Sequence, residues 1–197
     1  MGRTPLSTWG LARFLRRAGH TTESFGYVAA LEPFERITRR LRARLEVIAP
    51  RGRFAVVGHS LGGLLLREAI HQITPPPAHF VMIATPNQPP RLARRLRGVW
   101  PFRLLTGESG QLLSDPAFYS RLPGPGPVPY TIIAGTAGPR GRLSPFGMEP
   151  NDWLVAVSET RLSDRDTLIE LPVEHAFMMA NAGVRAAVAR ALATAAD

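Results

Sequence analysis

Residues 54–66 read Phe-Ala-Val-Val-Gly-His-Ser-Leu-Gly-Gly-Leu-Leu-Leu. The apolar, β-branched run at 55–57 is typical of a strand that is covered on both faces. The pattern G-x-S-x-G follows, and it predicts a sharp strand-to-helix turn that exposes the hydroxyl of Ser60 at the carboxyl end of a parallel sheet. The leucines from Leu61 onward continue as a helix. The segment therefore predicts a nucleophilic serine beside the N–H of Leu61, which can stabilise an oxyanion.

Length and composition set the outer limits of the interpretation. The chain has 197 residues, so we treat 1–197 as a single domain with its own core. It contains no cysteine, which excludes disulfides, thiolate metal sites and cysteine nucleophiles. It has no run of 18 apolar residues and no signal-peptide pattern, so the default expectation is a cytoplasmic protein, which an upstream start would change.

The net charge is +9, and all 24 basic residues are arginines. The arginines are scattered over predicted helices and no nucleic-acid-binding motif accompanies them, so we expect no nucleic-acid partner. Peripheral contact with an anionic membrane stays open.

Helical and strand-like patterns alternate along most of the chain, which predicts an α/β fold with a mostly parallel sheet and crossover helices. We expect helices over 7–19, 33–48, 61–73 and 176–195. We expect strands over 21–28, 54–57, 79–84, 129–134 and 166–171.

The alternation stops between the strands at 79–84 and 129–134. We interpret 86–128 as an insertion that either forms a small cap or lid over the site or makes a surface connection. It contains a basic amphipathic helix at 91–97, and shorter helical pieces around Leu112 and Phe118. The basic helix either touches anionic lipid or presents a solvated face.

A serine hydroxyl is a weak nucleophile that needs a base within hydrogen-bond reach and a third group to orient that base. His59 lies inside the turn, His20 follows a helix, and His71 belongs to the helix after the turn. His79 opens a strand at its amino end, whereas catalytic groups gather at the carboxyl ends of parallel strands. His175 follows the last strand at the correct edge, so it is our candidate for the base.

The acid is expected between the serine and the histidine in the chain, because the G-x-S-x-G pattern accompanies the order serine, acid, histidine. Asp152 is best placed, in the loop after the strand at 129–134. The alternative for Asp152 is a turn residue or a helix cap. The remaining acidic candidates are Asp115, Asp164, Asp166, Glu149 and Glu174.

Together these motifs resemble the α/β-hydrolase superfamily, in particular bacterial lipases and esterases and the lipases similar to GPI inositol-deacylases. The resemblance rests on the elbow at 58–63, Thr85-Pro-Asn87, Asn151-Asp152 with the Val-Ala-Val-Ser that ends at Ser158, and His175 in a late loop. It implies a serine hydrolase that cleaves a carboxylic ester through an acyl-enzyme on Ser60, with Asp152 and His175 completing a triad. The implied substrate is a small-molecule ester or a lipid, and no cofactor or metal is implied.

Two other functional classes remain open. One is acyl transfer or thioester cleavage at the same serine. The other is a non-catalytic, truncated hydrolase scaffold.

The sequence departs from the family at its amino end. Members have an apolar strand ending in His-Gly, followed by a loop that supplies the second oxyanion N–H. Residues 1–7 resemble that loop, and the strand itself is missing. We therefore expect an N-terminally truncated fold, with Met1 at the second oxyanion position and the true start of the protein upstream.

Overall fold

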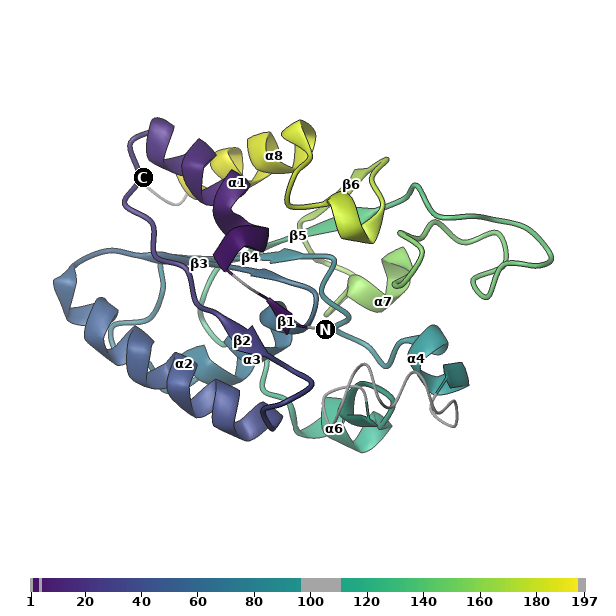
Figure 1. Ribbon diagram of the computed structural model, residues 1–197, viewed down its shortest axis with the longest axis horizontal. Coiled ribbons are helices and arrows are strands. Elements are labelled where there is room, and N and C mark those ends of the chain that lie inside the picture. The colour runs from purple at the N-terminus through teal and green to yellow at the C-terminus, as the bar shows by residue number, and fades with distance from the viewer. Residues whose placement is uncertain (1, 4, 97–110, 195–197) are drawn as a thin grey trace.

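The central feature of the computed structural model is a four-stranded parallel sheet (Figure 1). The structure describes residues 2–3, 5–96 and 111–194. The strand order is β3-β4-β5-β6, and each neighbouring pair is parallel. The strands are β3 (Ala55–His59), β4 (His79–Ile83), β5 (Tyr130–Gly135) and β6 (Leu168–Leu171). This confirms the predicted α/β class.

Two pairs of helices cover the two faces of the sheet (Figure 1). One face carries α2 (Phe34–Ile48) and α3 (Leu61–Ile70), and the other carries α1 (Pro5–Arg17) and α8 (Ala182–Ala193). Strand β4 contributes side chains to the core on both faces of the sheet, because successive side chains of a strand point to opposite faces. Phe80 and Met82 belong to the core cluster with α2 and α3, whereas Val81 and Ile83 belong to the cluster with α1 and α8.

Helix α2 forms as its spacing predicts. Phe34, Ile37, Leu41 and Leu45 recur every three or four residues and are buried. The arginines between them lie on the opposite side, so the helix packs its apolar stripe against the sheet and keeps its charge in water.

The prediction of a strand over 21–28 is wrong in extent and in pairing. Only Tyr27–Val28 forms a strand, β2, which pairs antiparallel with β1 (Gly2–Arg3) in a separate two-stranded sheet. The preceding residues are coil, and Glu23 among them pairs with Arg44 and Arg51 on the α2 side.

Both terminal helices begin elsewhere than predicted. Helix α1 starts at Pro5, because proline fits the first helical position, so Ser7 lies inside the helix and is not its cap. Helix α8 starts at Ala182 and not at 176, because the Asn181 side chain accepts a hydrogen bond from the Val184 N–H and caps the helix there. Residue 195, the predicted end of this helix, lies outside the described residues.

Strand β3, which precedes the serine turn, is at the edge of the sheet. It pairs with β4 on one side, and within residues 2–3, 5–96 and 111–194 no strand pairs with its other side. The prediction that the first strands are lacking is therefore confirmed for the part of the chain that the structure describes.

The segment 86–128 contains α4 (Arg91–Leu96) and α6 (Pro116–Arg121). Phe118, Leu122 and Val128 are buried in the core cluster of α2 and α3, so the end of the segment is packed onto the body. Residues 97–110 are outside the described part, and they include the end of the predicted basic helix. That this segment acts as a cap stays a prediction.

A buried arginine on α3 fixes both ends of this segment. The guanidinium of Arg67 donates to the Asn87 Oδ1 at 3.1 Å and to the carbonyls of Leu122 and Pro123 at 3.2 and 3.0 Å. Burial lowers the pKa of Arg67 to about 10, so the side chain is still charged at neutral pH. Asn87 in turn donates to the Thr160 carbonyl at 2.7 Å.

We expect Arg67→Met to lower the free energy of unfolding by about 2–4 kcal/mol, because two buried acceptors and one partly buried acceptor lose their donor. Denaturant unfolding monitored by circular dichroism measures this loss. The matched control is Arg39→Met on the exposed side of α2, which should change the stability by less than about 0.5 kcal/mol. A loss of similar size in both variants would contradict the anchoring role of Arg67.

In the part of the chain that the structure describes, no helix is long and apolar enough to span a bilayer.

Candidate functional site

Ser60 occupies a strained turn between β3 and α3. Its backbone has φ 56° and ψ −128°, a left-handed conformation that a residue with a side chain rarely adopts. Its N–H donates to the Ile83 carbonyl at 2.9 Å, which fixes the turn against the neighbouring strand β4. This is the geometry that the G-x-S-x-G pattern predicts.

Two glycines permit this turn by close approach of the backbone. A Cβ on Gly58 would lie 2.6 Å from the Cα of Gly63, and one on Gly63 would lie 1.9 Å from the Thr85 hydroxyl oxygen. Neither position has room for a side chain. The start of α3 can therefore pack directly on the loop after β4, and Ser60 lies at the carboxyl edge of the sheet.

Asp152 and His175 meet at the same edge. Asp152 lies in the loop between β5 and α7 (Val157–Thr160), and His175 opens the 3₁₀ turn η2 (His175–Phe177) after β6. The His175 Nδ1 is 2.7 Å from the Asp152 Oδ2, and the His175 backbone N–H donates to the Asp152 carbonyl at 2.9 Å. Asp152 is 1% exposed and His175 is 7% exposed. The pair is thus held by main chain and side chain together, away from water.

The second carboxylate oxygen of Asp152 stabilises its own loop. Oδ1 accepts hydrogen bonds from the N–H groups of Leu154 and Val155, at 3.0 and 2.7 Å. The turn passes through Trp153, whose φ of 84° is again left-handed, and its N–H is held by the Asn151 side chain. Asp152 is therefore both a turn residue, as the alternative interpretation proposed, and the partner of His175.

The His175 ring also contacts the serine turn. Its centroid is 4.7 Å from that of His59, the residue directly before Ser60. The structure therefore brings His175 against Asp152 and against the residue directly before Ser60, from three separate loops.

The comparisons with known proteins agree with this architecture. A sequence model of the alpha/beta hydrolase family matches residues 7–195. The chain belongs to the alpha/beta hydrolase family. No curated protein sequence matches it.

Solved structures of this α/β-hydrolase's fold include lipolytic enzymes and a thioesterase. A structure from the study of the metagenome-derived lipolytic enzymes LipS and LipT matches this chain with a TM-score of 0.68 at 15% identity. The match covers 98% of this chain and 88% of that one. Bacillus licheniformis lipase BlEst2 gives 0.61 at 20% identity, covering 79% and 72%. The NocB thioesterase domain gives 0.54 at 19% identity, covering 96% and 89%. At these identities the likeness shows the fold alone.

The rival acids of this α/β-hydrolase have other partners. Asp115 caps α6 by accepting from the Ala117 N–H, and Glu149 binds Arg91. Asp164 is exposed before β6, at the amino edge. Glu174, next to His175, is half-buried.

Asp166 is the most heavily bonded of these acids. Its oxygens accept from the Tyr130 hydroxyl at 2.6 Å, from the N–H of Leu162 at 2.6 Å, and from the N–H and hydroxyl of Ser163. Burial alone would raise the pKa of Asp166, but the hydrogen bonds from Tyr130, Ser163 and Leu162 outweigh it and lower the pKa.

We expect Asp166→Asn to lower the free energy of unfolding at pH 7 by about 1–2 kcal/mol, because charged hydrogen bonds are lost. A depressed pKa stabilises the fold above the unfolded value, about 3.9, and this contribution is lost as the pH falls through the lower folded value. The difference from the native chain should therefore shrink below about pH 4. Urea unfolding at several pH values measures it, with exposed Asp164→Asn as the control. A difference that is constant with pH would contradict the assignment.

The other histidines fit structural positions. His79 opens β4 at the amino edge, as predicted, and its Nε2 is 2.9 Å from the Thr131 hydroxyl. Burial lowers the pKa of His79, which favours a neutral ring. His20 and His71 are exposed.

Of the two predicted oxyanion positions, Leu61 and Met1, the structure describes Leu61. Leu61 is the first residue of α3, so its N–H is among the donors of the first turn, which have no intrahelical acceptor. Met1 lies outside the described residues, so its predicted place in the oxyanion hole stays a prediction.

Sequence reasoning missed an ion-pair network beside the acid loop. The Arg91 guanidinium binds Glu149, and it donates to Glu159 at 2.9 Å, while the Arg91 N–H donates to the same Glu159 oxygen at 2.8 Å. The other Glu159 oxygen accepts from the Ala156 N–H. The only signal in the sequence was the arginine-rich run itself, because its partners lie more than 50 residues away.

Over the described residues, no cluster of three His, Cys, Asp or Glu side chains is arranged to hold a metal ion.

Proposed function

We propose that this α/β-hydrolase is a serine hydrolase that cleaves a carboxylic ester through an acyl-enzyme on Ser60. The observation that carries the proposal is the buried Asp152–His175 pair beside the strained Ser60 turn. An oriented imidazole next to a serine on a sharp turn is the arrangement that nucleophilic catalysis by serine requires.

The contact with Asp152 selects the tautomer of His175. An ionised carboxylate only accepts hydrogen bonds, so the proton of the neutral imidazole sits on Nδ1, facing the Asp152 Oδ2. The Nε2 lone pair is then free to accept the Ser60 proton. The negative charge of Asp152 also stabilises the imidazolium that forms.

The reaction then proceeds in two halves. The Ser60 oxygen attacks the ester carbonyl while His175 takes its proton, and collapse of the tetrahedral intermediate expels the alcohol, which receives that proton from His175. Water repeats the sequence on the acyl-enzyme: His175 takes a proton from it, and the acid is released as Ser60 regains its own. The N–H of Leu61 stabilises the oxyanion in both halves, and a donor near Met1 is the expected second one.

Apolar groups near the site favour a lipid or another ester with an apolar part as the substrate. Trp153, next to Asp152, and Phe177, two residues after His175, are both exposed. BlEst2 is described as a lipase, and LipS and LipT as lipolytic enzymes, which supports the same class. NocB is described as a thioesterase, so thioester cleavage or acyl transfer is the second candidate.

Labelling with a fluorophosphonate tests the proposal. We expect one adduct per chain by intact mass, located on Ser60 by peptide mapping. His175→Ala should abolish the adduct, whereas His71→Ala, a substitution at an exposed histidine, should leave it unchanged. Turnover of acyl esters against the matching thioesters then separates the two candidates. Folded protein that takes no adduct would overturn the proposal and favour a non-catalytic scaffold.

A further inference from the structure

The loop after β5 is an ordered projection and not a loose connection. We call residues 139–148 the 139–148 loop. The Gly141 N–H donates to the Gly147 carbonyl at 2.8 Å, and the Ser144 hydroxyl donates to the Pro139 carbonyl at 2.8 Å. Gly141 and Gly147 have φ values of 127° and 61°, which close the loop on itself. The loop extends well away from the sheet, beyond β5 and α7 (Figure 1).

The 139–148 loop is anchored by one apolar side chain and presents two others to solvent. Phe146 is buried, and the Arg91 guanidinium lies 5.8 Å from its ring centroid. Leu143 is 102% exposed and Met148 is 75% exposed. Moving a fully exposed leucine side chain into an apolar phase is favourable, so Leu143 can contribute to binding at such a phase.

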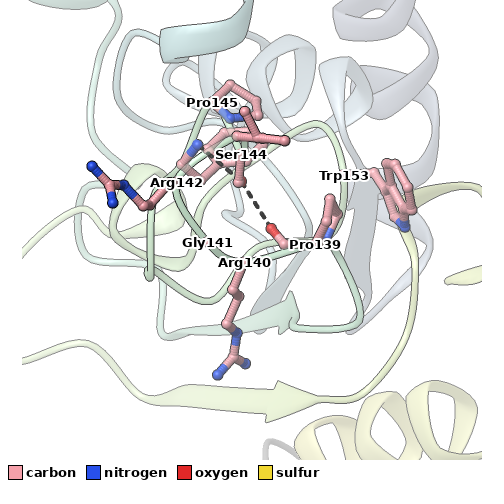
Figure 2. A pocket seen from close by; sticks show the side chains of 9 residues that line it. Pro139, Arg140, Gly141, Arg142, Ser144, Pro145 and Trp153 are labelled. Carbon is pink, nitrogen blue, oxygen red and sulfur yellow. Dashed lines mark hydrogen bonds between the residues drawn. The ribbon is translucent and has the colours of Figure 1, made fainter.

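Two arginines, Arg140 and Arg142, precede the exposed Leu143 in the same loop. Arg140 and Arg142 are both exposed, and Figure 2 shows their guanidinium groups pointing outward, in different directions, from the depression of about 520 Å³ between the loop and Trp153. The nearby carboxylate of Glu149 is paired with Arg91. The positive charge of Arg140 and Arg142 is therefore available to anionic groups outside the molecule.

The exposed apolar side chains concentrate at this edge. Eight large hydrophobic side chains are exposed among the residues that the structure describes, and four of them, Leu143, Met148, Trp153 and Phe177, lie in the loops that carry Asp152 and His175. Leu143 and Trp153 line the same depression. Half of the large hydrophobic side chains that are exposed in the described part of the chain therefore lie in the loops of the candidate site.

We propose that the 139–148 loop docks the protein on an anionic lipid surface. Leu143 and Met148 enter the interfacial region, and Arg140 and Arg142 bind lipid phosphates. Aliphatic tips beside long cationic side chains suit such an interface, because the stems lie along apolar surface while the charges stay at the headgroups. The net charge of +9 adds a long-range attraction to the same surface. The inference does not rest on the proposed ester hydrolysis.

A lipid surface fits these side chains better than a folded partner does. The exposed apolar groups are single protruding side chains on two loops, and the depression behind them is bordered by the two outward-pointing arginines. A protein partner requires a continuous complementary surface, whereas a bilayer accepts separate insertions.

Co-sedimentation with vesicles tests the proposal on the full chain. We expect binding to vesicles of phosphatidylglycerol and phosphatidylcholine, weakened by salt, and much weaker binding to phosphatidylcholine alone. Leu143→Ser should lower the partition coefficient by about tenfold. Its control is Leu31→Ser, at a leucine that is 80% exposed before α2, which should bind as the native chain does.

The charged pair has its own control. Arg142→Gln should weaken binding to the anionic vesicles by about fivefold and leave binding to phosphatidylcholine unchanged. Arg165→Gln, at an exposed arginine before β6 on the opposite edge of the sheet, should change neither. The proposal would be overturned if the native protein did not bind anionic vesicles. It would also be overturned if the two control variants lost as much vesicle binding as the loop variants.

A soluble substrate separates this inference from the proposed function. Leu143→Ser should keep fluorophosphonate labelling and turnover of a water-soluble short-chain ester, because Leu143 is not in the catalytic machinery. Vesicle binding without labelling would refute the hydrolase proposal alone. Labelling without vesicle binding would refute the docking proposal alone.

Discussion

Ser60→Ala is expected to lower the kcat of ester hydrolysis on the order of 10⁵-fold, with little change in KM. The substitution removes the oxygen that forms the acyl-enzyme, while the Leu61 N–H and the surrounding apolar surface are kept. The turn itself should survive, because its fixed points are the Ser60 N–H bond to the Ile83 carbonyl and the close approach of Gly58 and Gly63, none of which involves the hydroxyl.

Steady-state and single-turnover kinetics measure this effect. In the native chain, a burst of released alcohol should report the acyl-enzyme, and the burst should vanish in Ser60→Ala. Ser120→Ala removes an exposed hydroxyl on α6, which donates to the Ala117 carbonyl of the same helix, and serves as the matched control. A Ser60→Ala variant with turnover within tenfold of the native value would assign the nucleophile elsewhere. Unfolding curves of the two variants should coincide with the native curve.

The second large effect is expected at Asp152, where two substitutions separate catalysis from stability. Asp152→Asn keeps an acceptor oxygen for the N–H groups of Leu154 and Val155, but it places an amide donor or a neutral oxygen opposite His175. The imidazole is then held in the wrong tautomer or without a countercharge. We expect kcat to fall by about 10⁴-fold.

Asp152→Ala should lose activity equally and stability in addition. It leaves the N–H groups of Leu154 and Val155 without their acceptor, at a cost of about 1–3 kcal/mol for each buried group left unsatisfied. Paired measurements of kcat and urea unfolding therefore distinguish the variants. Asp164→Asn is the control for both quantities. An Asp152→Asn variant with near-native kcat would show that Asp152 serves the loop only.

The candidate site was chosen from a short local pattern and one topological rule, and its catalytic role stays a prediction. The glycines around Ser60 permit the close backbone approach of the sharp turn, and parallel strands bring the loops that follow them to one edge. His175 could therefore be chosen from its place after a late strand, and Asp152 from its loop together with the expected chain order of serine, acid and histidine. The structure adds the contact itself, at 2.7 Å between Nδ1 and Oδ2, and the second role of Asp152 in its own turn.

Polar contacts between residues far apart in the chain could not be predicted from the sequence. Arg67 looks like any other arginine on an amphipathic helix, yet it is buried and binds the carbonyls of Leu122 and Pro123 some 55 residues away. Every residue has a backbone carbonyl, so no sequence pattern indicates which carbonyls accept a hydrogen bond from a distant side chain. The strand predicted at 21–28 is also wrong: its β-branched and aromatic residues predict a strand, whereas most of it is coil, in which Glu23 pairs with Arg44 and Arg51.

The ion pairs of Arg91 have a mechanical consequence. They join α4 to Glu149 and Glu159, which bracket the turn that holds Asp152. A displacement of α4 must therefore either break the two ion pairs and the backbone hydrogen bond to Glu159, or move the turn that holds Asp152 as well. The position of α4 and the alignment of the acid are thus thermodynamically coupled, and by reciprocity whatever steadies one steadies the other.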